Sequence, residues 1–335
     1  MSLHAETERV GERDPPDPAD AAVRVDGLTK TYGSGDAAVT AVDDVSFAVE
    51  AGTAVGLLGP NGAGKTTAIK SLLGLVIPTH GTAEVAGIDV HADPRAAYRH
   101  VGAMLEGARN TYWRLTVREN LRFFAALAGR KPADVRERHD ELLARFDLTG
   151  KADTPVKELS RGMQQKVSLA ATLARDAEVV FLDEPTLGLD VESSRELRRE
   201  LRRLVEESGM TVVVSSHDMD VIEAVCDRVV IMSDGAIVAD ERVADLLDLF
   251  RTRSYAVTVE GAVPERVRAR LRERFDADGF DAVEAGERFT ARVVGDGFYE
   301  LTDTLRDAGL TVADFQTAEP DLEDVFLRVT GRDDA

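Results

Sequence analysis

Three glycines and a lysine stand at fixed spacing between an apolar run and a segment with helical periodicity. The apolar run Thr53–Leu58 predicts a buried strand, and the residues after Thr66 predict a helix. The connecting residues are Gly59, Pro60, Asn61, Gly62, Ala63, Gly64, Lys65, Thr66 and Thr67. Glycines let the backbone curl until several N–H groups face one anion, and the helix start adds partial positive charge. With the Lys65 cation, the segment predicts a cradle for a phosphate chain, and the Thr66 hydroxyl is placed to bind Mg²⁺.

An acidic pair follows a second apolar run. Val179 to Leu182 predict a buried parallel strand that ends at Asp183 and Glu184. Such a pair alone is more often a solvated turn or a helix cap. Its place downstream of Lys65 favours a metal role for Asp183 and a general-base or water-positioning role for Glu184.

A third segment predicts an anion site that lacks a phosphate of its own. It consists of Leu159, Ser160, Arg161, Gly162 and Met163. Ser160 is placed to cap a helix over Met163 to Arg175, with Gly162 offering a backbone N–H. In isolation this string would be an ordinary helix start, but here it follows the glycine loop and precedes the acidic strand.

Together with Ser215 to Asp218 (SSHD), these segments resemble the ATPase subunit of ABC transporters. The resemblance implies ATP and Mg²⁺ as ligands, and a head-to-tail dimer in which Ser160 and Gly162 close over the γ-phosphate held by the other subunit. The family form LSGGQ is altered here, because Arg161 and Met163 replace a glycine and the glutamine.

Three further positions match that family. The resemblance assigns adenine stacking to Tyr32, γ-phosphate sensing to His217, and contact between subunits to Asp190 in the segment Leu187 to Asp190. A tyrosine at a strand end or a lone histidine is more often structural. Their order along the chain favours the functional interpretation.

One position departs from the family. After the expected strand Val101–Leu105, the family has a glutamine that contacts Mg²⁺ and the attacking water, whereas this chain has Glu106. The surrounding sequence EGARNTYWRL is similar to that of ATPases of ABC-2-type exporters, including daunorubicin-resistance pumps. Tyr112, Trp113 and Arg114 then fall where a membrane subunit would dock; packing of the loop around the tryptophan is the alternative.

Charge and composition narrow the function classes. The chain has 61 Asp and Glu against 41 Lys and Arg, a net charge of −20, and one cysteine, Cys226. Because Lys and Arg do not outnumber Asp and Glu, binding to duplex DNA is disfavoured. A single cysteine excludes an intrachain disulfide. Such acidity suits a cytosol rich in KCl, as in a halophile. Denaturation curves recorded at falling KCl concentrations test this hypothesis. No apolar run approaches the roughly 18 residues of a membrane span, so we expect a cytoplasmic protein attached to the inner membrane face through a permease.

The expected fold is an α/β P-loop NTPase core with a helical subdomain, an antiparallel β portion and a small C-terminal α+β domain of ferredoxin-like order. The expected parts are an acidic disordered tail (1–21), an ATPase domain (22–240, helical subdomain about 107–175), a linking helix (241–252) and a C-terminal domain (253–335). The last domain is predicted to contain strands Tyr255–Val259, Ala282–Ala285, Phe289–Val294 and Thr311–Phe315, helices Pro264–Phe275 and Phe298–Ala308, and a short helix Leu322–Arg328.

The favoured function is an ATP-hydrolysing motor that drives separate ABC-2-type permease subunits, as a homodimer or heterodimer, for export. Two alternatives stay open at this point. One is a soluble ABC ATPase acting on DNA or ribosomes, although its usual coiled coils, zinc insertions or second ATPase domain are missing from the sequence. The other is a nucleotide-binding switch with low turnover. Glu106 and Arg161, which depart from the family pattern, favour this alternative.

Replacing Glu106 by glutamine tests the departure from the family. A carboxylate binds Mg²⁺ more strongly than an amide does but adds a negative charge near the triphosphate. We expect Glu106→Gln to keep ATP binding and to change turnover and its Mg²⁺ dependence, measured by phosphate release. Unchanged turnover and unchanged Mg²⁺ dependence would contradict a position near the metal.

Overall fold

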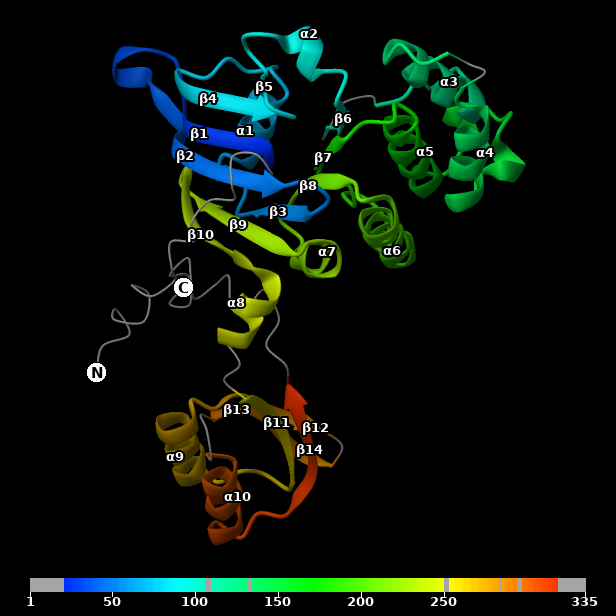
Figure 1. The fold of residues 1–335 in the computed structure, drawn as a ribbon. Coiled ribbons are helices and arrows are strands. Elements are labelled where there is room, and N and C mark those ends of the chain that lie inside the picture. The colour runs from blue at the N-terminus through cyan, green and yellow to red at the C-terminus, as the bar shows by residue number, and fades with distance from the viewer. Residues whose placement is uncertain are drawn as a thin grey trace. The chain divides into compact units, whose positions relative to one another are not determined.

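The structure is a computed structural model that describes residues 21–105, 110–131, 134–249, 253–283, 285–293 and 297–318. The chain divides into two compact units, Met1–Val243 and Ala244–Ala335 (Figure 1). Each unit has a hydrophobic core of its own.

Two sheets form the first unit. The antiparallel sheet has the order β2-β1-β4-β5 and contains β1 (Ala21–Tyr32), β2 (Val39–Glu50), β4 (His80–Val85) and β5 (Ile88–Asp89). The larger sheet has the order β10-β9-β3-β8-β7-β6 and contains β3 (Ala54–Leu58), β6 (Val101–Met104), β7 (Val179–Asp183), β8 (Thr211–Ser216), β9 (Arg228–Ser233) and β10 (Ala236–Arg242). Its strands are parallel except for β10, which forms a hairpin with β9. Every residue of β3, β7 and β8 is buried, as apolar runs in a parallel sheet require.

Helix α1 (Lys65–Leu72) lies between the two sheets. One core cluster joins Val85 of the antiparallel sheet, Ile69 and Leu72 of α1, and Phe181 and Val213 of the parallel sheet. Both sheets therefore fix the start of α1, which is where the glycine loop ends.

Helices cover the rest of the first unit. They are α2 (Pro94–Ala97), α3 (Val117–Leu127), α4 (Arg136–Arg145), α5 (Arg161–Leu173), α6 (Val191–Ser208) and α7 (Met219–Val225), with 3₁₀ turns at Gly35–Ala37, Thr149–Lys151 and Val156–Glu158. Figure 1 shows α3, α4 and α5 grouped together, and α5 contacts the edge strand β6. The start of α3 is fixed by a capping box between Thr116 and Glu119. Cys226 is the C-cap of α7 and is buried.

Helix α8 (Val243–Leu249) begins where the second unit starts. That unit follows with β11 (Arg253–Glu260), α9 (Glu265–Phe275), β12 (Asp278–Val283), β13 (Gly286–Val293), α10 (Gly297–Asp307) and β14 (Val312–Ala318). The sheet order β12-β13-β11-β14, antiparallel throughout, is that of a ferredoxin-like unit, and both helices lie on one face of it (Figure 1).

Several boundaries differ from the sequence expectation. Strand β12 starts at Asp278 instead of Ala282, because Asp278 already pairs with Thr290 of β13. Strand β13 starts at Gly286 instead of Phe289, and β14 ends at Ala318 instead of Phe315. The signature helix starts at Arg161 instead of Met163 and ends at Leu173. The expected tail and the helix Leu322–Arg328 lie outside the described residues. Within the described ranges, no helix has the length and apolar character needed to cross a membrane.

A buried histidine in α4 gives a pH prediction. His139 is 2% exposed, and its Nε2 has no hydrogen-bond partner among the described residues. Burial, helped by the nearby charge of Arg122, lowers the pKa of His139 below its ordinary 6.5. The folded state therefore disfavours protonation, so stability is retained above pH 6.5 and is lost as pH falls from 6.5 toward the lowered pKa.

We expect acidification from pH 7.5 to 5.5 to lower the free energy of unfolding of the wild type. Once the pH is below the lowered pKa of His139, the loss is about 1.4 kcal/mol for each unit by which that pKa is lowered. His139→Leu should remove this part of the slope. The readout is denaturant unfolding followed by the fluorescence of Trp113, which lies just before α3. The exposed His80 provides the control: His80→Leu should keep the wild-type slope, and an equal slope in His139→Leu would contradict the assignment.

Candidate active site

The glycine loop connects β3 to α1 in a conformation that requires glycine. Gly64 is the N-cap of α1 with φ 99°, and a Cβ built on it would lie 2.3 Å from the carbonyl oxygen of Ala41. Gly62 has φ 87° but faces open space. Lys65 Nζ donates to the carbonyl oxygens of Gly59 at 2.5 Å and Pro60 at 3.2 Å. The lysine charge therefore lies over the loop that was predicted to hold phosphates.

Asp183 connects this loop to the end of β7. It is 2% exposed, and its Oδ1 accepts hydrogen bonds from Thr66 Oγ1 at 3.3 Å and from Ser215 Oγ. Its other carboxylate oxygen, Oδ2, is buried with no hydrogen-bond partner among the described residues. A buried carboxylate with an unsatisfied oxygen beside a threonine hydroxyl fits a cation that takes oxygen ligands, such as Mg²⁺. Glu106, the third predicted metal ligand, lies outside the described residues.

Glu184 is turned away from the strand axis toward β8. It has φ 51°, a left-handed value for a non-glycine residue that costs on the order of 1–3 kcal/mol. Its Oε2 accepts hydrogen bonds from Ser216 Oγ at 3.3 Å and His217 Nδ1 at 2.9 Å. Glu184 is 8% exposed, whereas the His217 side chain is 49% exposed. The structure thus brings the two predicted catalytic residues into direct contact.

The signature segment points outward from its own chain. Ser160 is the N-cap of α5, its Oγ accepts from the Met163 N–H at 3.3 Å, and the residue is exposed. Arg161 is also exposed, Leu159 is buried and Met163 is half-buried. Across the described part of the chain, no hydrogen bond or ion pair joins Ser160 to the glycine loop.

Comparison with known proteins shows the family of this chain. A family model described as ABC transporter matches residues 42–187. The chain is 37% identical over 315 residues to the daunorubicin resistance ATP-binding protein DrrA2 of Streptomyces coeruleorubidus, covering 92% of this chain and 95% of that protein. It is 35% identical to the Nod factor export ATP-binding protein I of Ralstonia nicotianae, covering 92% and 94%. The chain belongs to the ATP-binding subunits of ABC transporters.

Solved structures of this family support the fold. A dimeric ATP-binding cassette in a post-hydrolysis state, bound to ADP and phosphate, aligns with a TM-score of 0.60 at 28% identity, covering 66% of this chain and 98% of that one. An ATP-binding subunit of an ABC transporter aligns with a TM-score of 0.60 at 29% identity, covering 68% and 93%. The chain is accordingly an ABC transporter ATPase, the ATP-binding motor subunit of such a transporter.

Within this ABC ATPase, the signature helix lies against the first turn of α6, which follows the predicted dimer loop. A Cβ on Gly162 would lie 2.9 Å from Ser193 Oγ of α6. Ser193 in turn donates from its N–H and its hydroxyl to the two carboxylate oxygens of Asp190, both at 2.9 Å. These hydrogen bonds lower the pKa of Asp190, which is the exposed N-cap of α6. Gln165 Nε2 also donates to the Pro185 carbonyl at 2.6 Å, next to Glu184.

Several residues of this arrangement were not singled out by the sequence. Ser215 and Ser216 lie in the SSHD segment, but only its histidine was assigned a role. Ser193 carried no signal, and Gln165 was given no role of its own, because their contacts join segments that are far apart along the chain. Tyr32, the predicted adenine platform, is 44% exposed at the end of β1, with Lys30 Nζ 5.0 Å from its ring centroid; its role stays a prediction.

A matched pair of glycine substitutions tests the loop geometry. Gly62→Ala places a Cβ in open space and should cost only the left-handed strain, about 1–2 kcal/mol. Gly64→Ala adds the collision with the Ala41 carbonyl and should cost roughly 1–3 kcal/mol more. Denaturant unfolding gives the difference in free energy of unfolding between the two variants. Equal losses would show that the Ala41 carbonyl moves aside and does not constrain the loop.

Proposed function

We propose that two copies of this subunit, or this subunit and a related one, close head to tail around two ATP molecules and use hydrolysis to drive separate membrane permease subunits. The observation that supports this most is the separation of two anion sites. The glycine loop gathers Lys65, Thr66 and Asp183, whereas Ser160 is exposed at a helix start without a described link to that loop. Each site is incomplete alone, and a second protomer completes both.

In this proposal the residues of one chain have separate roles in binding and hydrolysing ATP. The loop from Gly59 to Thr67 holds the phosphates, and Tyr32 stacks on adenine. Thr66, Asp183 and Glu106 hold Mg²⁺, which when bound neutralises charge on the phosphates.

Glu184 accepts a proton from the attacking water or orients that water. His217 donates Nδ1–H to Glu184 and so couples the carboxylate to the γ-phosphate it is proposed to sense. The signature residues Leu159 to Met163 serve the partner's ATP, and Asp190 contacts the partner.

The membrane partner is proposed to be an ABC-2-type permease, and the direction to be export. The names of two relatives, one for daunorubicin resistance and one for Nod factor export, support this. Large apolar side chains are also exposed near α3, with Tyr112 at 52%, Trp113 at 44% and Leu127 at 63%. Through such a permease the subunit would lie on the inner face of the cell membrane, without nucleic acid as a partner.

A groove of about 480 Å³, which Leu127 helps to line, supports a docking place for the permease. Apolar side chains line it from the end of α1, from β6 and from α3, including Leu75, Leu105 and Leu127, with Arg95 and Arg175 among its polar residues. Leu75 and Leu127 are more than half exposed, and exposed apolar patches mark interaction sites. Because Leu105 directly precedes Glu106, a helix of the permease seated there would lie next to the proposed metal ligand.

Glu184→Gln tests the catalytic assignment. We expect it to keep ATP binding and ATP-dependent dimerisation while lowering phosphate release about 10²–10⁴-fold, because general-base catalysis contributes on that order. Phosphate release and light scattering in KCl buffer give the two readouts. Ser160→Ala should instead weaken the ATP-dependent dimer.

Glu178→Gln is the matched control, because Glu178 is exposed and precedes the opposite end of the same strand, β7. Full turnover in Glu184→Gln would overturn its role. A wild type that binds ATP and dimerises without releasing phosphate would favour the low-turnover switch.

A further inference from the structure

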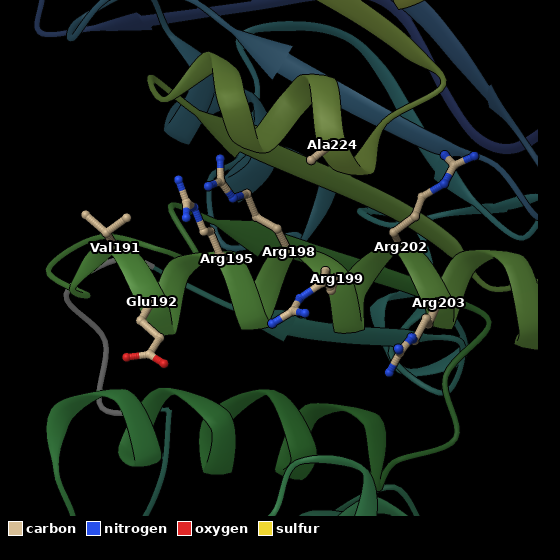
Figure 2. Close-up of a pocket in the computed structure, with 8 residues that line it drawn as sticks. All are labelled: Val191, Glu192, Arg195, Arg198, Arg199, Arg202, Arg203 and Ala224. Carbon is tan, nitrogen blue, oxygen red and sulfur yellow. The ribbon is translucent and has the colours of Figure 1, made fainter.

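Five arginines line one groove on α6 of this acidic chain. They are Arg195, Arg198, Arg199, Arg202 and Arg203, and together with Val191, Glu192 and Ala224 they surround a cavity of about 920 Å³ (Figure 2). The chain as a whole carries a net charge of −20. The groove on α6 therefore gathers cations on a chain that is acidic overall.

The core does not explain these arginines. The buried face of α6 is formed by Leu197, Leu201, Leu204 and Val205. The arginine side chains extend from the rest of the helix surface. In Figure 2, one group points toward α7, where Ala224 lies; it consists of Arg195, Arg198 and Arg202. Arg199 and Arg203 point the other way. Two rows of guanidinium groups therefore flank an elongated surface.

Neighbouring carboxylates satisfy only part of this charge. Arg198 pairs with Asp220 at 2.8 Å, Arg202 with Glu206 at 2.7 Å and Asp227 at 2.8 Å, and Arg203 with Glu200 at 2.8 Å. Arg195 and Arg199 are exposed and have no ion pair among the described residues.

The arginine spacing also opposes the helix itself. Arg195, Arg199 and Arg203 follow one another at i,i+4 spacing, where like charges destabilise a helix by a few tenths of a kcal/mol per pair. An anion lying along the groove would relieve that repulsion.

The chain itself supplies an acidic segment of suitable charge and reach. Residues 1–20 contain six carboxylates, Glu6, Glu8, Glu12, Asp14, Asp17 and Asp20, against two arginines. Twenty extended residues reach about 66 Å, whereas Arg195 to Arg203 span about 12 Å of helix.

The segment also joins the fold close to the end of α6. It enters at Ala21, which pairs with Glu50. Gly52, two residues further on, lies against Gly209, the C-cap of α6: a Cβ on Gly52 would be 3.4 Å from the Gly209 carbonyl oxygen.

We propose that the acidic segment 1–20 lies along the arginine groove of α6 in the same chain. Carboxylates pair with the fork-shaped guanidinium groups through charge-assisted hydrogen bonds, which Arg195 and Arg199 are free to donate. The contact weakens as KCl rises, because exposed ion pairs are screened. The interaction does not depend on the transport role.

Disulfide trapping in the full-length protein tests this. Thr7→Cys lies between Glu6 and Glu8, and Ala224→Cys lies at the groove on α7. Cys226 is fully buried, and burial strongly raises the pKa of its thiol, so it stays unreactive. The control pair is Thr7→Cys with Thr40→Cys, because Thr40 is exposed on β2 of the same unit.

Under mild oxidation at low KCl, we expect monomers with a disulfide from residue 7 to residue 224, at roughly five times the yield of the control pair. Arg195→Gln with Arg199→Gln should lower the yield about fivefold, as expected for losing two exposed ion pairs. The matched change Arg266→Gln with Arg270→Gln, at i,i+4 exposed positions of α9, should leave it unchanged.

Three results would overturn the proposal. Equal yields at residues 224 and 40 would mean that the segment has no preferred place. An unchanged disulfide yield in the variant with both α6 substitutions would mean that the arginines bind some other anion. A product found only as a covalent dimer would assign the groove to the segment of a second copy.

Discussion

The turn between β3 and α1 leaves no space for side chains on its inner side, and the site depends on this fit. A Cβ on Gly59 would lie 2.3 Å from the carbonyl oxygen of Met232 in β9, and one on Gly64 the same distance from that of Ala41 in β2. The loop backbone thus rests on both sheets, while α1 is buried between them. Because neither sheet can move without opening the core, Lys65 and Thr66 have one fixed position relative to β7.

The remaining chemistry follows from strand register. Asp183 of β7 lies directly beside Ser215 of β8, so the serine hydroxyl reaches the carboxylate. The next residue, Glu184, takes a left-handed conformation, and its side chain meets Ser216 and His217 of the neighbouring strand end. Neighbouring parallel strands place their carboxyl ends at one edge, which is why the proposed metal ligand and the proposed base can lie in consecutive positions and still have different partners.

Charge is distributed unevenly over this acidic molecule. Many arginines make exposed ion pairs with neighbouring carboxylates, such as Arg306 with Asp303 and Arg274 with Glu300, and pairs of this kind contribute about 0–1 kcal/mol each. The α6 arginines differ in that they line a groove. The same helix begins at Asp190, which is hydrogen-bonded by Ser193 and lies next to the signature helix. One helix therefore carries both the proposed dimer contact and the arginine groove.

The sequence by itself determined the family and most of the element order. The glycine loop, the apolar strands and the βαββαβ order of the second unit are local patterns, and the structure confirms the fold class that they predicted. The boundary at Asp278 was missed by a few residues, because pairing with β13 sets it. The signature helix starts at Arg161, directly after its predicted cap Ser160 and two residues earlier than expected.

Only the tertiary structure decided which side chains meet. The contacts of Asp183 with Ser215, Glu184 with Ser216, Gly162 with Ser193 and Gln165 with Pro185 join segments up to 32 residues apart. The unsatisfied Oδ2 of Asp183 and the row of arginines beside α7 are likewise consequences of packing. Periodicity assigns a residue to a face of its own strand or helix; the partner across that face depends on sheet order and register, which no local pattern encodes.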